Sequence, residues 1–157
     1  MIVRMGWAFI RGGDSFLDGR GAMTWKFLGI IPLFNASGPD ITRWATGRLN
    51  IESIWLPAVL CGADLAWTEI DDRHFRVRFF KHGELADISY RVEPDGRLRS
   101  VSMPRWGNPG NGPFRYVACG GTVGAERTFG GYTIPTQIPV CWYFGIDRSS
   151  PRASSSE

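Results

Sequence analysis

Segments in which hydrophobic and polar residues alternate occupy most of this chain, and they predict a β-rich protein. In one of the clearest, Phe75, Val77 and Phe79 alternate with Arg76 and Arg78, as in a strand with one buried face. Further strands are predicted over residues 5–11, 16–17, 22–28, 30–34, 65–70, 88–92, 98–103, 114–118, 123–129 and 138–144. Gly12-Gly13-Asp14 is predicted to be a turn, and Gly120-Gly121 is predicted to be a bulge or tight turn between strands.

One segment, residues 40–55, follows a helical period instead. Ser37 and Asp40 have the spacing of a capping box, and Pro39 suits the first helical turn because the N–H that it lacks has no partner there. Pro57 disfavours helical geometry at the residue before it, so the helix should end there. We therefore predict one amphipathic helix over about residues 40–55, with an apolar stripe of Ile41, Trp44, Ala45, Leu49 and Trp55.

The order of these elements is a meander of strands, one helix, and a second meander. The apolar face of a curled antiparallel sheet has to be covered, and the helix is the available cover. We therefore predict a mainly β (α+β) fold in which a curled, half-barrel-like antiparallel sheet covers the helix at 40–55. A chain of 157 residues is most simply one domain, placed at residues 1–147, followed by a disordered tail at 148–157.

Composition narrows the classes of function. The net charge is +3 and basic residues are scattered, so no nucleic-acid partner is expected. Arg4 interrupts the apolar N-terminus, so no transmembrane segment is expected. Cys61, Cys119 and Cys141 lack the spacing of a disulfide framework or zinc site, although one bond between Cys119 and Cys141 stays open. Reduced thiols favour a cytoplasmic location, unless an upstream signal or anchor is missing.

The helix carries the sharpest candidate for chemistry. Arg48 and Glu52 are four residues apart and lie on the same face as the apolar stripe, so they can form an ion pair. Charged groups on a core-facing stripe are costly unless they are paired. Two interpretations stay open: a structural ion pair that ties helix to sheet, or the polar element of a cavity between them.

We favour a non-catalytic binding module that holds a lipid-like or other hydrophobic ligand between sheet and helix. The candidate ligand-binding residues are Arg48, Glu52, Trp44, Trp55, Arg105 and Trp106. No catalytic residue, metal ligand or cofactor is predicted, because no nucleophile elbow, phosphate-binding loop or dinucleotide signature is present. The alternatives are an enzyme of unknown reaction that uses Glu52 with Arg48 or Arg105, and a structural protein that self-associates through an exposed edge strand near Pro139.

Four short motifs follow one another along the chain. They are G-x-G at residues 19–21, E-x-x-W-x-P at 52–57, R-W-G-N-P at 105–109 and F-G-G-Y-x-I-P at 129–135. Through them, over roughly residues 3–147, the chain resembles a family of uncharacterised, mostly bacterial proteins. The resemblance implies no activity, cofactor or catalytic residue. It also implies relatives that extend further at both ends, so we expect this chain to be truncated at both ends.

Overall fold

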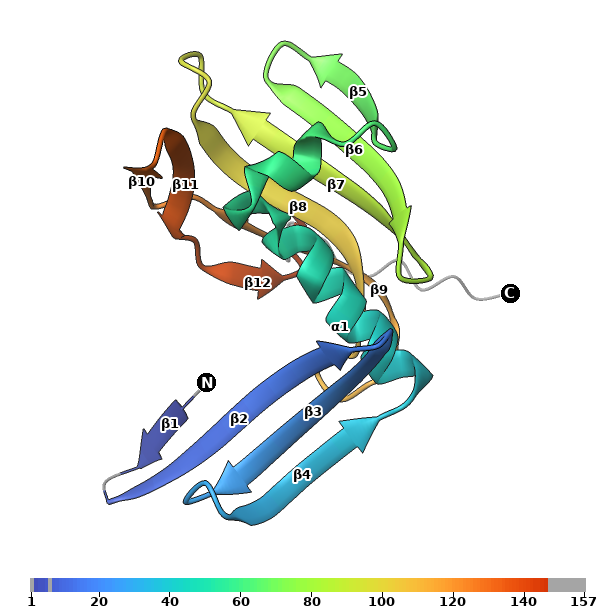
Figure 1. The fold of residues 1–157 in the computed structure, drawn as a ribbon, viewed down its shortest axis with the longest axis vertical. Coiled ribbons are helices and arrows are strands. Elements are labelled where there is room, and N and C mark those ends of the chain that lie inside the picture. The colour runs from blue at the N-terminus through green and yellow to red at the C-terminus, as the bar shows by residue number, and fades with distance from the viewer. Residues whose placement is uncertain (1, 6, 147–157) are drawn as a thin grey trace.

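The structure, a computed structural model, describes residues 2–5 and 7–146 (Figure 1). Within these residues the protein is mostly β, with one α-helix and antiparallel sheets, none of which closes into a barrel. The predicted fold class is therefore confirmed. The tail predicted at residues 148–157 lies outside the described residues.

The N-terminal sheet has four antiparallel strands in chain order, namely β1 (Ile2–Met5), β2 (Ala8–Leu17), β3 (Arg20–Phe27) and β4 (Ile31–Ser37). The turn predicted at Gly12-Gly13-Asp14 is wrong, because β2 runs straight through it. Gly12 pairs with Trp25 on β3, and a Cβ atom on Gly12 would lie 2.5 Å from the Trp25 indole. This glycine therefore makes room for an aromatic ring and does not reverse the chain.

The helical segment follows as α1 (Pro39–Ile51), η1 (Glu52–Trp55) and η2 (Pro57–Cys61), which confirms a helix close to the predicted 40–55. The predicted capping box is wrong. Gly38, at a φ of 110°, occupies the cap position, and no side chain caps the helix. A positive φ suits glycine, and the Asp40 carboxylate instead accepts a hydrogen bond from the Trp106 indole.

The second sheet has six strands in the order β12-β9-β8-β7-β6-β5, all antiparallel. These strands are β5 (Ala66–Asp71), β6 (His74–Lys81), β7 (Glu84–Val92), β8 (Leu98–Gly107), β9 (Arg115–Thr122) and β12 (Val140–Trp142). Gly120-Gly121 lies inside β9 and not between strands, so that prediction is also wrong. A Cβ atom on Gly120 would lie 2.4 Å from the Val101 carbonyl oxygen, and this close approach explains the glycine.

The strand predicted at residues 138–144 is shorter in the structure. β11 (Tyr132–Gln137) pairs with β10 (Ala125–Phe129) as a separate ribbon, and only β12 joins the six-stranded sheet, beside β9. Pro139 lies between β11 and β12. Because proline has no N–H to donate, it cannot extend the ladder, and the chain leaves the ribbon at this point.

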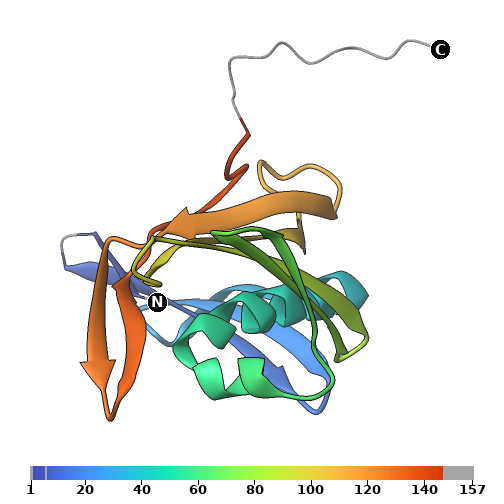
Figure 2. The same ribbon diagram turned by 90° about the horizontal axis from the view of Figure 1, so that it is seen from above.

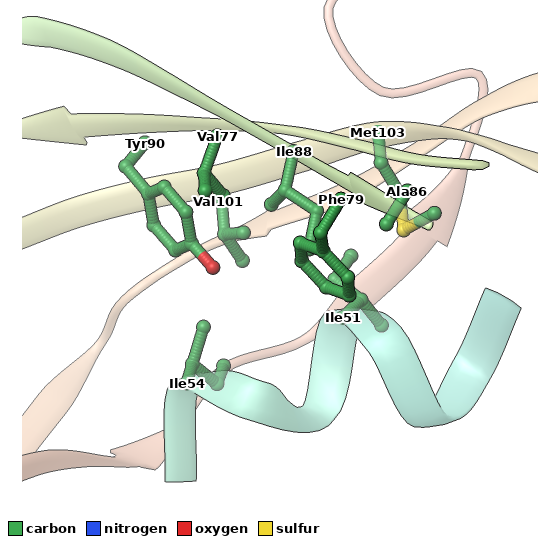
Figure 3. Close-up of a cluster of buried hydrophobic side chains, with 9 residues drawn as sticks. All are labelled: Ile51, Ile54, Val77, Phe79, Ala86, Ile88, Tyr90, Val101 and Met103. Carbon is green, nitrogen blue, oxygen red and sulfur yellow. The ribbon is translucent and has the colours of Figure 1, made fainter. Parts of the chain in front are cut away.

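The main core lies between the helical segment and the six-stranded sheet (Figures 2 and 3). Ile51 and Ile54 face the sheet from the helical side. The N-terminal sheet packs on the first half of α1, where a Cβ atom on Gly21 would lie 2.8 Å from the Ile41 carbonyl oxygen. The sheet residues of the core cluster are Val77, Phe79, Ala86, Ile88, Tyr90, Val101 and Met103.

Candidate functional site

A cavity of about 300 Å³ lies where the end of the helical segment meets strands β8, β9 and β12. The strands provide one wall and the helical segment the other. Most of the lining side chains are apolar, and three carry charge. The lining consists of Trp44, Arg48, Ile51, Glu52, Ile54, Trp55, Val101, Arg105, Cys119, Val140, Cys141 and Trp142.

Arg105 is the buried charge of this cavity and is only 7% exposed. Gly47 on α1 makes room for it, because a Cβ atom there would lie 2.9 Å from Arg105 Cγ. The guanidinium carbon lies 4.6 Å from the ring centroid of Trp44 and 5.2 Å from that of Trp142, within the range of cation–π attraction. Burial lowers the pKa of Arg105, and the nearby Cys119 thiol partly offsets that effect.

Arg105 makes few hydrogen bonds for a buried guanidinium. Its Nη2 donates to the Trp44 carbonyl oxygen at 3.3 Å, and its Nε has no hydrogen-bond partner. No carboxylate in the described chain forms an ion pair with it. The cavity therefore contains a buried cation with an unused donor.

Arg48 and Glu52 form an ion pair at the border of the cavity, with Arg48 Nε 2.7 Å from Glu52 Oε1. Arg48 also pairs with Asp14 of β2 through its Nη1. The hydrogen bond that Arg48 donates to Glu52 is the main cause that raises the pKa of Arg48. Arg48 thus links the helical segment to β2, and the Arg48–Glu52 pair also lines the cavity. Trp44, Arg48 and Glu52 also line a neighbouring groove of about 670 Å³ that extends along β2 and β3.

The structure brings together five of the six predicted site residues, namely Trp44, Arg48, Glu52, Trp55 and Arg105. Trp106 does not line the cavity. Successive residues of a strand point to opposite faces of the sheet, so Trp106 lies on the other side of β8 from Arg105. There its indole donates to Asp40 at 3.0 Å, and the Arg43 guanidinium lies 3.7 Å from its ring centroid.

Sequence reasoning missed Val101, Cys119 and Trp142 as parts of this site. Val101 lies in the strand predicted at 98–103, but Cys119 falls just outside the strand predicted at 114–118. No local pattern indicates that β12 lies beside β9. That pairing places Trp142 opposite Cys119. Asp14 was missed because it was assigned to a turn, whereas its place in β2 brings it to Arg48.

The three cysteines are free, and Cys119 alone is buried. Burial raises the pKa of Cys119, whereas Cys61 and Cys141 are exposed.

Because the thiolate is the reactive form, we expect Cys119 to react with a disulfide reagent at pH 8 at least about tenfold more slowly than the other two cysteines. Stopped-flow measurement of thiol release checks this. In guanidinium chloride all three should react at similar rates, and the Cys119→Ala variant should lose the slow phase. If all three thiols of the native protein react rapidly, the result would contradict the buried position of Cys119.

Other kinds of site find no support in the residues that the structure describes. Among them, no group of three or more histidine, cysteine, aspartate or glutamate side chains is placed to hold a metal ion. None of the helices in residues 2–5 and 7–146 is long and apolar enough to cross a membrane.

Comparison with known proteins agrees with the resemblance found in the sequence. A model of DUF6920, a family of unknown function, matches residues 2–150. The search found no significant match among curated proteins or among solved structures. Since the family match extends over almost the whole chain, this protein belongs to DUF6920, a family of unknown function.

Proposed function

We propose that this protein is a non-catalytic binding module that holds a small hydrophobic or lipid-like molecule in the cavity between the helical segment and strands β8, β9 and β12. The observation that carries the proposal is a cavity of about 300 Å³ whose lining is mainly aliphatic and aromatic, with three charged side chains. Pockets that bind small molecules are concave and mostly apolar, with a few polar groups that orient the ligand.

One side of the cavity lies at the edge of the six-stranded sheet. Val140, on the edge strand β12, is 46% exposed and lines the cavity, and we propose that the ligand enters beside it. The Trp55 indole donates to the Pro135 carbonyl oxygen at 2.9 Å, which ties the helical wall to the β10–β11 ribbon. A wall held in this way favours a largely preformed site.

An enzyme that uses Glu52 is less well supported. A general base needs a carboxylate that can take up a proton from the substrate. Glu52 is already engaged in an ion pair with Arg48 at 2.7 Å, so its carboxylate is not free to face a substrate.

Self-association through the edge near Pro139 also ranks below ligand binding. Pro139 directly precedes β12, the edge strand of the six-stranded sheet. A strand of three residues offers few unpaired backbone groups to a second chain. Light scattering during size-exclusion chromatography at high protein concentration tests this alternative, and a monomer would count against it.

Filling the entrance tests the proposed binding function. We expect Val140→Trp to lower the affinity for a neutral hydrophobic dye such as Nile red about tenfold or more, because the indole would occupy space at the cavity mouth. Titration of dye fluorescence measures the affinity, and native mass spectrometry of the purified protein detects molecules that copurify.

Ile70→Trp is the matched control for this experiment. Ile70 lies on β5, the opposite edge of the same sheet, is 47% exposed, and is not part of the cavity lining. We expect this variant to bind the dye as the unmodified protein does. Equal dye affinity in the Val140→Trp and Ile70→Trp variants, or no dye binding by the unmodified protein, would argue against the proposed site.

A further inference from the structure

The row of side chains on β8 that faces the helical segment ends in a charge. Val101, Met103 and Arg105 alternate along the strand and share one face. All three are buried, and Val101 and Met103 belong to the core cluster. Arg105 therefore occupies a position where the fold would otherwise place an apolar side chain.

A buried guanidinium at such a position normally has an anionic partner, because an unpaired charge is costly to bury. Here Glu52, the one carboxylate in the cavity lining, is taken by Arg48, which also pairs with Asp14. Glu52 accepts from Arg48 Nε at 2.7 Å, and Asp14 accepts from Arg48 Nη1. Together these three residues carry one net negative charge at the border of the cavity, and they leave Arg105 without a carboxylate.

The donors of Arg105 are also only partly used. Nη2 donates to the Trp44 carbonyl oxygen, and Nε donates to nothing. The Cys119 thiol beside the guanidinium is a weak acceptor. An arginine in this state can bind a carboxylate strongly, because a charge-assisted hydrogen bond in a desolvated site is stronger than a neutral one.

We infer that the ligand of this cavity carries a carboxylate that binds Arg105, while its apolar body lies against Trp44, Ile51, Ile54 and Val101. The ligand class is thus a small amphiphilic carboxylate. This inference rests on the proposed function, since it assigns the head group of a molecule held in the same cavity. A volume of 300 Å³ is that of about ten water molecules in the liquid, which suits a carboxylate with a short aliphatic chain.

Three probes separate the head group from the apolar body. Octanoate has both, 1-octanol has the apolar body with a neutral head, and butyrate has the carboxylate with a short body. We expect isothermal titration calorimetry to show that octanoate binds about 10- to 100-fold more tightly than 1-octanol, because a charge-assisted hydrogen bond from the guanidinium to a carboxylate is stronger than one to a neutral hydroxyl oxygen. Butyrate should bind more weakly than octanoate.

Arg105→Met removes the charge while it keeps a long side chain. We expect this variant to lose the preference for octanoate and to bind 1-octanol within about threefold of the unmodified protein, because the apolar lining is unchanged. Arg99→Met is the matched control. Arg99 lies on the same strand, is exposed, and does not line the cavity, so its loss should leave the preference intact.

The outcomes distinguish this inference from the proposed function. If octanoate and 1-octanol bind the unmodified protein equally well, the cavity binds apolar molecules but the carboxylate assignment is wrong. The same holds if Arg105→Met, with an unchanged circular dichroism spectrum, keeps the preference for octanoate. If neither probe binds, the proposed binding function fails, and the assigned head group fails with it. The comparison of probes on the unmodified protein decides the question even if Arg105→Met does not fold.

Discussion

Replacing Ile88 by alanine should lower the free energy of unfolding by about 2 to 5 kcal/mol, which is the range for deleting a large aliphatic side chain from a packed core. Ile88 lies in the middle of β7 with an exposure of 0%. It pairs in register with Val77 on β6 and belongs to the cluster that faces Ile51 and Ile54 of the helical segment (Figure 3). The variant would leave a void between sheet and helix. Urea denaturation followed by circular dichroism measures the loss.

Leu85→Ala on the same strand is the control for this prediction. Leu85 is 55% exposed, so removing its side chain should change the free energy of unfolding by no more than about 0.5 kcal/mol. Two variants with the same loss would mean that the six-stranded sheet does not bury its Ile88 face against the helical segment. In that case the cavity would lack one of its walls.

Hydrophobic periodicity was enough to predict the fold class because the central strands β6, β7 and β8 each have one face on the core. The strand at residues 75–79 and the helix at 40–55 correspond closely to β6 and α1. Two of the errors lie at glycines. Gly12 and Gly120 resemble turn residues in the sequence, but both lie inside strands, where they give space to Trp25 and to the Val101 carbonyl group. A close approach between segments that are distant in sequence cannot be seen from a local pattern.

The candidate site was partly predictable for a similar reason. Arg48, Glu52, Trp44 and Trp55 share one helical segment, so their spacing alone predicts that they lie together. Arg105 is far from these residues in sequence, and the structure places it in the same cavity. Strand alternation is the signal that separates Arg105 from Trp106, because residues at odd and even positions of β8 face opposite sides of the sheet.

The cavity also raises the question of how the two sheets cooperate. α1 packs against β3 on one side and β8 on the other, and Arg48 links the helix to Asp14 of β2. We propose that residues 1–147 form a single domain in which both sheets share this helix. A domain of this kind should unfold in one cooperative transition, with the N-terminal sheet contributing to the stability of the whole.

Replacing Gly21 by valine should test that proposal with a large effect. The added Cβ atom would lie 2.8 Å from the Ile41 carbonyl oxygen and 2.8 Å from the Thr42 Cα atom. Both are backbone atoms of α1, so the helix has to move away from β3. The Gly21 amide also donates to Thr42 Oγ1 at 3.0 Å, and this bond would be strained. We expect a loss of about 3 kcal/mol in the free energy of unfolding, at the upper end of the range for overpacked cores.

The matched control for Gly21→Val is Gly13→Val on β2, where an added Cβ atom has no neighbour within 4 Å. It should change stability little, because valine is well suited to a strand. Urea denaturation read by far-ultraviolet circular dichroism and by tryptophan fluorescence measures both variants. If the sheets share one domain, both signals should shift together in Gly21→Val. A split into two transitions, with only one shifted, would mean that the N-terminal sheet unfolds independently of the sheet that forms the cavity.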